Sequence, residues 1–137
     1  MEKDLVIGIN SEFRFLEFES EAECWYFIFD KIVFNIDGIW RILIEKKIKF
    51  VSLDNKQLFG LTKPIDLVQE INKLLKGKLL LEVKVKQFSS DLILTFTDNI
   101  QIEIFISSSG YETYSFEIDN KRYIGMGSGN LSIHDNI

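Results

Sequence analysis

Hydrophobic and polar residues alternate along much of the second half of the chain. Leu79, Leu81, Val83 and Val85 occupy one face of an extended segment, and charged residues occupy the other. A period of two is the pattern of a strand with one buried face. The same period recurs in two later segments, so three consecutive strands are predicted, the second and third with inward residues Leu92, Leu94, Phe96 and Ile102, Ile104, Ile106.

The turn between the last two of these strands can be predicted from the pairing of inward residues. A two-residue loop would place Leu94 opposite Glu103 on one face. A three-residue or bulged loop at residues 98–100 instead places Leu94 opposite Ile104 and Phe96 opposite Ile102. We therefore predict the longer loop, with Asn99 in the left-handed conformation.

The first half of the chain is also rich in strand patterns. Asp37 followed by Gly38 is typical of a type I′ hairpin turn, which would join residues 32–36 to residues 39–45. A second turn near Glu45 leads into residues 48–52. Residues 13–19 and 24–30 form another predicted pair, and the second strand of that pair carries apolar residues on both faces, as a central strand does.

One helix is predicted, at residues 64–76. Pro64 suits a first helical turn, Gly77 suits a stop, and acidic residues precede basic ones along the segment. Its apolar stripe comprises Leu67, Val68, Ile71, Leu74 and Leu75. The predicted fold class is therefore α+β, mainly an antiparallel sheet of about nine to eleven strands with one helix packed on it, in a single domain over residues 1–137.

Composition supports a folded chain that needs neither a disulfide nor a membrane. The 137 residues are 46% hydrophobic, with only eight glycines and one proline. A single cysteine, Cys24, excludes an intramolecular disulfide. The longest apolar run, residues 24–29, is far shorter than the roughly 20 residues that span a bilayer. We therefore expect a cytoplasmic protein with no membrane contact.

The net charge of −5 is concentrated at the beginning of the chain. Residues 1–30 contain eight acidic residues against two basic ones, and the remaining residues are almost balanced. A one-sign surface repels nucleic-acid phosphates and favours basic proteins. We therefore expect no nucleic-acid binding and consider two roles for the cluster, a solvated hairpin edge that prevents aggregation or a protein-binding surface at Glu17, Glu19, Glu21 and Glu23.

The residues that usually carry chemistry are few and scattered. The one histidine, His134, lies near the end of the chain, where we expect fraying. Cys24 has Glu21 and Glu23 beside it, which disfavours a reactive thiolate. The glycines of residues 125–129 precede a predicted strand instead of a helix, so they fit a bulge or strand crossing better than a phosphate loop. No enzyme, cofactor or metal site is predicted.

The segment around Glu112 is the most distinctive local feature. If strict alternation extends back from Ile118, Glu112 shares the inward face with Tyr114 and Phe116. A carboxylate on an apolar face must be paired, hydrogen-bonded or protonated. Either Glu112 lies at the open end of the strand or is held by an amide, Arg41 or Lys84, or it is a buried acid at a binding edge with Tyr111 and Tyr114.

Several short motifs in this half of the chain resemble a known group. They are Asp91 to Phe96, the Asp98-Asn99 turn, the run from Ser108 to Glu112, and Gly127 to Leu131. Together they resemble small uncharacterised bacterial proteins that look like immunity proteins of polymorphic-toxin loci. That group commonly has tryptophan after the Ser-Ser-Gly-Tyr-Glu motif, whereas this chain has Tyr114 two positions later. The resemblance implies a non-enzymatic cytosolic inhibitor and supplies no catalytic residues.

Three functions remain open at this stage. The first is an immunity-type protein that binds a basic toxin domain through the four glutamates, with Tyr111, Glu112 and Tyr114 as further contacts. The alternative is a small-ligand binding module with a strand-lined pocket near Glu112, Trp25, Trp40 and Tyr114. The third is an enzyme built on Asp91, Glu103 and Glu112, which alternation disfavours because Glu103 points outward. The oligomeric state is open in each case.

Overall fold

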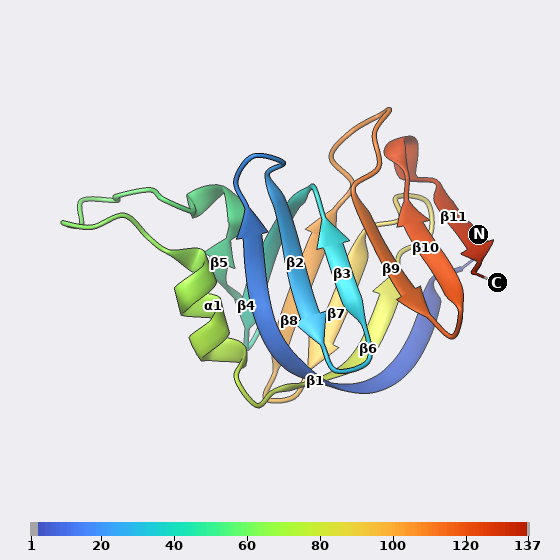
Figure 1. Ribbon diagram of the computed structural model, residues 1–137, viewed down its shortest axis with the longest axis horizontal. Coiled ribbons are helices and arrows are strands. Elements are labelled where there is room, and N and C mark those ends of the chain that lie inside the picture. Colours follow the sequence, from blue (N-terminus) through green and yellow to red (C-terminus); the bar gives the residue numbers. More distant parts are fainter. Residues whose placement is uncertain (1–2, 137) are drawn as a thin grey trace.

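Eleven strands form one antiparallel sheet, accompanied by one α-helix, in the computed structural model, which describes residues 3–136 (Figure 1). The strands are β1 (Leu5–Glu19), β2 (Cys24–Phe29), β3 (Val33–Ile36), β4 (Ile39–Ile44), β5 (Lys47–Val51), β6 (Leu79–Val85), β7 (Leu92–Phe96), β8 (Ile100–Phe105), β9 (Tyr114–Ile118), β10 (Lys121–Gly125) and β11 (Leu131–Asp135). The helix α1 (Leu67–Leu75) lies between β5 and β6 in sequence, and short 3₁₀ turns occupy Ser52–Asp54 and Gly127–Gly129. This confirms the predicted α+β, mainly antiparallel fold class.

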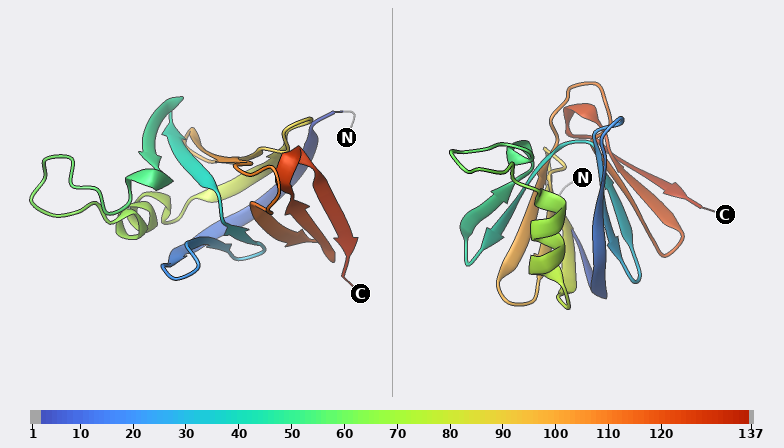
Figure 2. Two further views of the ribbon diagram at one scale, coloured as in Figure 1. Left: turned by 90° about the horizontal axis from the view of Figure 1, so that it is seen from above. Right: turned by 60° about the vertical axis from the view of Figure 1, so that its left-hand side comes forward.

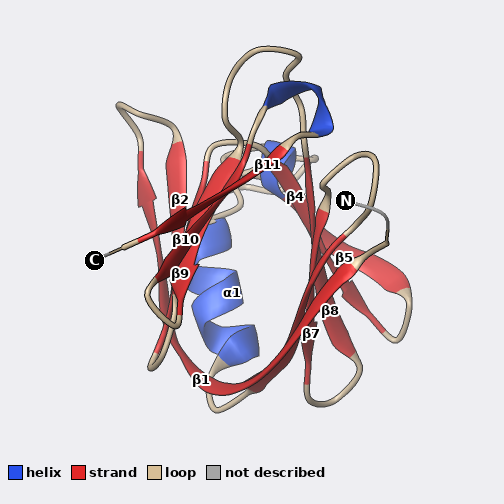
Figure 3. Ribbon diagram, turned by 90° about the vertical axis from the view of Figure 1, so that its right-hand side faces the viewer, coloured by secondary structure: helices blue, strands red, loops and turns tan. Residues whose placement is uncertain are grey.

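The long strand β1 joins two halves of the sheet. The strand order is β11-β10-β9-β3-β2-β1-β6-β7-β8-β4-β5. The first half of β1 pairs with β6 and the second half pairs with β2, with register shifts between Gly8 and Ser11 and between Phe13 and Phe15. Bulges of this kind bend a strand and increase its twist. The sheet therefore folds over along β1, giving a first wing (β2, β3, β9, β10, β11) and a second wing (β6, β7, β8, β4, β5) that face each other (Figure 3).

The core lies between the two wings. Trp40 of β4 is fully buried and makes edge contacts with Trp25 and Phe27 of β2, at ring centroid separations of 5.0 and 5.3 Å. Phe29 of β2 also contacts Phe96 of β7, with ring centroids 5.7 Å apart and the ring planes tilted by 37°. Aromatic pairs of this geometry add to the free energy gained by burial. The inward faces of strands that are distant in the sheet thus share one hydrophobic core.

Helix α1 closes one side of the folded sheet (Figure 2). It begins where the Asp66 side chain accepts a hydrogen bond from the Gln69 amide at 3.2 Å, and its buried residues Leu67, Ile71 and Leu75 enter the core. The second half of β1 has β2 on one edge only. On the other edge, the Asn72 side chain of α1 makes the two hydrogen bonds that a neighbouring strand would make. Its Oδ1 accepts from the Leu16 amide at 2.7 Å, and its Nδ2 donates to the Leu16 carbonyl at 3.1 Å.

Asn72→Ala is expected to lower the free energy of unfolding by about 1 to 2 kcal/mol, because both backbone groups of the buried residue Leu16 lose their partner. Urea unfolding followed by circular dichroism measures the change. Lys73→Ala, at the exposed neighbouring position, is the matched control and should change stability by less than about 0.5 kcal/mol. Equal stability of the Asn72 variant and the wild type would show that α1 is held by its apolar face alone.

The predicted turn between β7 and β8 has the right length but begins one residue earlier. Leu94 pairs with Ile102 and Leu92 with Ile104, so the loop is residues 97–99, and the expected pairing of Leu94 with Ile104 is wrong. Asp98 and Asn99 both have positive φ, at 61° and 59°, which confirms the left-handed Asn99. A shift of two residues keeps every side chain on its predicted face, so alternation alone cannot detect it.

The predicted Asp37-Gly38 hairpin is wrong. β3 pairs with β2 and β9, whereas β4 pairs with β5 and β8, so residues 37–38 cross from one wing to the other. Gly38 is needed for close packing, since a Cβ there would lie 2.3 Å from the Thr113 methyl group. The Asp37 amide donates to the Thr113 carbonyl at 2.7 Å. Gly38 is therefore required for close packing against Thr113, and the sequence pattern alone does not distinguish this from a glycine required by a hairpin turn.

Three further details differ from the predictions. The expected inward set of β6 is wrong at its beginning, because a register shift between Leu80 and Glu82 buries Leu80 and exposes Leu81. The helix begins at Leu67 and not at residue 64, since Asp66 caps it. His134 lies in β11 opposite Arg122, and the expected fraying is wrong because β11 pairs with β10. Within residues 3–136, no helix has the length and apolarity to cross a membrane.

Candidate functional site

Four exposed glutamates surround the end of the β1–β2 hairpin, and we call them the acidic hairpin: Glu17, Glu19, Glu21 and Glu23. Glu17 and Glu19 alternate with Leu16 and Phe18, which face inward, so the strand period directs both carboxylates to solvent. Glu21 and Glu23 lie in the turn of residues 20–23. The predicted hairpin is confirmed by the pairing of Phe18 with Trp25 and of Glu19 with Cys24.

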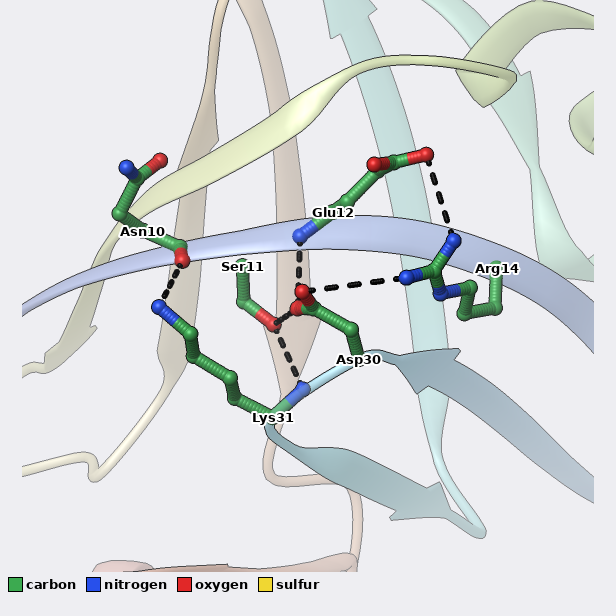
Figure 4. Close-up of polar contacts among 6 residues, drawn as sticks. All are labelled: Asn10, Ser11, Glu12, Arg14, Asp30 and Lys31. Carbon is green, nitrogen blue, oxygen red and sulfur yellow. Dashed lines mark hydrogen bonds and ion pairs between the residues drawn. The ribbon is translucent and has the colours of Figure 1, made fainter.

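Other acidic residues of the amino-terminal segment are engaged in structural contacts. Asp4 accepts a hydrogen bond from the Gln87 amide at 2.9 Å and forms an ion pair with Lys86 at 3.4 Å. Asp30 lies between β2 and β3 and accepts from the Ser11 hydroxyl at 2.5 Å and from the Glu12 amide at 2.9 Å (Figure 4). These carboxylates hold β1 in place instead of presenting charge to a partner.

The network around Asp30 stabilises the bend of β1. Ser11 Oγ also accepts from the Lys31 amide at 3.0 Å, and Lys31 Nζ donates to the Asn10 carbonyl at 2.7 Å. Arg14 lies between Glu12 at 3.4 Å and Asp30 at 3.9 Å (Figure 4). The register shift beside Ser11 leaves backbone groups without ladder partners, and this network supplies partners for several of them.

Hydrogen bonding from Ser11 lowers the pKa of Asp30 below its ordinary value, despite some desolvation. A carboxylate with a lowered pKa in the folded state stabilises the fold above its unfolded pKa of about 3.9, and this stabilisation is lost as pH falls through the folded value. Asp30→Asn is therefore expected to reduce the difference in stability between neutral and strongly acidic pH. Urea midpoints at the two pH values measure it. Glu21→Gln, in the exposed turn, should leave that difference unchanged.

The acidic hairpin has no such countercharges. Among the described residues, none of its four carboxylates forms an ion pair with lysine or arginine. Within the part of the chain that the structure describes, their one polar side-chain contact is a weak hydrogen bond that Tyr26 donates to Glu19 at 3.4 Å. Four like charges thus lie together on a surface without neutralisation, and their field extends into solvent over about a Debye length.

A groove of about 410 Å³ connects the end of the acidic hairpin with other loops at the same end of the molecule. It is lined by Ser20 and Glu23 of the hairpin, by Asp37 of the crossover, by Lys56, and by Ser107 at the beginning of the loop between β8 and β9. Phe18 and Trp25 form part of its wall, with ring centroids 4.2 Å apart. The candidate binding surface therefore continues beyond the glutamates into a groove with aromatic and acidic groups.

The structure separates the three predicted contacts near residue 112. Tyr111 is 82% exposed and Glu112 is also exposed, because β9 begins only at Tyr114 and alternation does not reach back to residue 112. The hypothesis of a buried Glu112 is therefore wrong. Tyr114 is buried, and its hydroxyl donates to the Ser90 carbonyl at 2.9 Å. Burial raises the pKa of Tyr114, which belongs to the core and is unavailable to a partner in this conformation.

The carboxylates considered for catalysis do not gather in a common site. Glu103 forms an ion pair with Arg41 at 2.6 Å, and Asp91 accepts from the Ile106 amide at 2.9 Å. Glu112 lies in the exposed loop. Burial raises the pKa of Cys24 to about 11, which disfavours a thiolate. No group of three potential metal ligands occurs within residues 3–136.

The residues proposed for a small-ligand pocket are also dispersed. Trp40 is fully buried between Trp25 and Phe27, and Tyr114 is 2% exposed. The glycines at residues 125–129 precede a strand, and Gly127 allows close packing, since a Cβ there would lie 2.5 Å from the Gly110 amide nitrogen. Neither Trp40 nor Tyr114 can therefore contact a ligand at Glu112 without rearrangement of the core.

Two parts of this surface were missed by sequence reasoning. Asp37 and Lys56 line the groove, and an exposed apolar loop with Phe59 at its end lies beyond Lys56. The groove depends on the crossover of residues 37–38, which the hairpin prediction excluded. The loop had a signal in the sequence, because Leu58, Phe59 and Leu61 lie outside any strand or helix period beside Gly60.

Comparisons of the chain with protein-family models, with curated proteins and with solved structures gave no match.

Proposed function

We propose that this chain is a non-enzymatic, cytoplasmic, immunity-type protein that binds and neutralises a basic toxin domain through the acidic hairpin. One observation carries the proposal: within residues 3–136, the carboxylates of Asp4, Glu12 and Asp30 have basic partners, whereas those of the acidic hairpin do not. Unneutralised charge of one sign accelerates encounter with a partner of opposite sign. It also opposes binding of nucleic acid.

The shape of the same region supports a protein partner more than a small substrate. The glutamates lie around the end of the β1–β2 hairpin, beside an open groove whose wall includes Phe18 and Trp25. Aromatic groups next to charged rims are typical of protein interfaces, where they provide anchors. Asp37 and Glu23 in the groove could receive a lysine or arginine side chain of the partner. Exposed Tyr111 and Glu112 extend this surface on the neighbouring loop.

The test is neutralisation of a toxin in a living cell. The chain is expressed together with the carboxyl-terminal domain of a secreted protein encoded beside it in its genome, and colony formation is measured. We expect the chain to restore growth and to form a complex with the purified domain. An unrelated acidic protein of similar size is the control. Growth arrest despite full expression of the folded chain, together with no complex, would reject the proposed function.

A further inference from the structure

Residues 55–66 form a projection that we call the finger, and it extends away from the folded sheet beside α1 (Figures 1 and 2). It is an ordered structure with its own hydrogen bonds. At its base, the Lys56 amide donates to the Ile65 carbonyl at 2.8 Å and the Ile65 amide donates to the Gln57 carbonyl at 2.9 Å. At its tip, the Leu61 amide donates to the Leu58 carbonyl at 2.8 Å.

The finger exposes apolar side chains between two positive charges. Leu58 is 51% exposed, Phe59 65% and Leu61 59%. Lys56, at the base of the finger, and Lys63 flank these residues in sequence, and neither forms an ion pair within residues 3–136. A projecting group of three large apolar residues is unfavourable in water and is typical of a contact surface.

Phe59 occupies a position that the turn itself does not favour. It has a φ of 47°, and Gly60 follows with a φ of 78°. Turns with two left-handed central residues prefer asparagine followed by glycine, and an aromatic side chain is disfavoured there. Strain of this kind is common at functional positions. The Phe59 side chain therefore destabilises the turn. Contact of its ring with another surface would explain why phenylalanine occupies this position.

A hollow with complementary properties lies on the same side of the molecule. It has a volume of about 580 Å³ and lies between the second half of β1 and α1. Its apolar lining comes from Leu16, Phe18 and Val68, while Glu17 and Glu19 contribute its acidic groups. An apolar tip between two lysines thus corresponds to an apolar hollow with two glutamates, the match of charge and polarity expected of binding partners.

We propose that the finger of one copy of this chain docks in the hollow between β1 and α1 of a second copy. The finger runs directly into α1, and Val68 of α1 lines the hollow, so donor and acceptor surfaces adjoin on each copy. Adjoining, self-complementary surfaces suit a twofold dimer in which both contacts form at once. The ordered finger loses little conformational entropy when it docks.

The first test uses Phe59→Asn. This change replaces the strained residue with the one that the turn prefers, so we expect the midpoint of thermal unfolding to rise by about 2 to 4 °C. The same change removes the aromatic anchor, so the dimer dissociation constant should increase at least about tenfold. Sedimentation velocity from micromolar to millimolar protein measures it. Gln57→Asn, at the base of the finger, is the control and should leave association unchanged.

The second test exchanges the charges of the two surfaces. One variant carries Lys56→Glu and Lys63→Glu, and the other carries Glu17→Lys and Glu19→Lys. Each variant alone places like charges at both contacts and should dissociate at concentrations where the wild type is dimeric. An equimolar mixture of the two variants restores opposite charges at both contacts, so it should form a heterodimer of wild-type affinity within about threefold.

Several outcomes would overturn this proposal. They are a wild-type chain that stays monomeric at millimolar concentration, a dimer that tolerates Phe59→Asn, and a variant mixture that does not associate. Binding of monomers to vesicles of phosphatidylcholine and phosphatidylserine through the finger would assign it to a lipid surface instead. Docking would cover Glu17 and Glu19, so the dimer and the toxin complex exclude each other, and a dimer must dissociate before its acidic hairpin binds the toxin domain. Phe59→Asn leaves the four glutamates in place, so this variant should remain monomeric and still neutralise the toxin. Loss of association with retained neutralisation separates this proposal from the proposed function.

Discussion

Replacing Gly125 with alanine is expected to lower the free energy of unfolding by about 2 to 3 kcal/mol, within the range of overpacked cores. A Cβ at this position would lie 2.2 Å from the Tyr114 ring, well inside van der Waals contact. The ring cannot move away easily, because Tyr114 is buried and its hydroxyl donates to the Ser90 carbonyl. Urea unfolding monitored by tryptophan fluorescence measures the loss.

Gly8→Ala is the matched control for this prediction. Gly8 also lies in a strand, but nothing lies within 4 Å of the Cβ that would be added there. Alanine at Gly8 should be neutral or stabilising by up to about 1 kcal/mol, since it restricts the unfolded chain. If the two variants proved equally stable, the close packing of β9 against β10 around Tyr114 would not be a constraint in solution.

Replacing all four glutamates of the acidic hairpin with glutamine is expected to slow association with the proposed partner, a basic toxin domain, at least about tenfold at low salt. The dissociation rate should change less, because exposed charges act mainly during encounter. Stopped-flow fluorescence across a series of salt concentrations measures both rates. The wild-type association rate should fall steeply with salt, and that of the variant should fall only weakly.

A variant with the same loss of charge elsewhere provides the control. Glu45, Glu70, Asp119 and Asp135 are exposed residues outside the candidate surface, and their amide variant removes four charges as well. It should retain most of the wild-type association rate. If both variants slowed association equally, net charge and not the acidic hairpin would govern encounter. If neither did, the acidic hairpin would have no role in association.

The strand and turn patterns predicted the fold class because most of this chain is half-buried sheet. Leu92, Leu94, Ile102 and Ile104 all face the core as alternation indicated. The bulge near Leu80 could not be predicted, since a register shift depends on how β6 meets β7 and β1. Local sequence reports the period of a strand reliably, but it does not report where a partner strand interrupts it.

The candidate site was only partly predictable, because part of it depends on which distant segments of the chain lie side by side. Charge counting located the acidic hairpin correctly, because exposed glutamates in an alternating strand need no tertiary partner to face solvent. Gly38 was misjudged because it depends on a contact with Thr113, about 75 residues away in sequence. Glu112 was misjudged because β9 begins only at Tyr114. The finger was missed because its projection from the body is a tertiary feature, although the apolar residues outside any strand or helix period could have indicated it.

The sharing of β1 between both wings has a consequence for synthesis on the ribosome. The β1–β2 hairpin can form early. In contrast, β3 obtains its second neighbouring strand only when β9 has emerged, and β4 obtains its second neighbouring strand only when β8 has emerged. Pairings so distant in sequence form slowly. One edge of β3 and one edge of β4 therefore stay unpaired until β9 and β8, respectively, have been synthesised. The repulsion between four early glutamates would help keep neighbouring nascent chains apart during that interval.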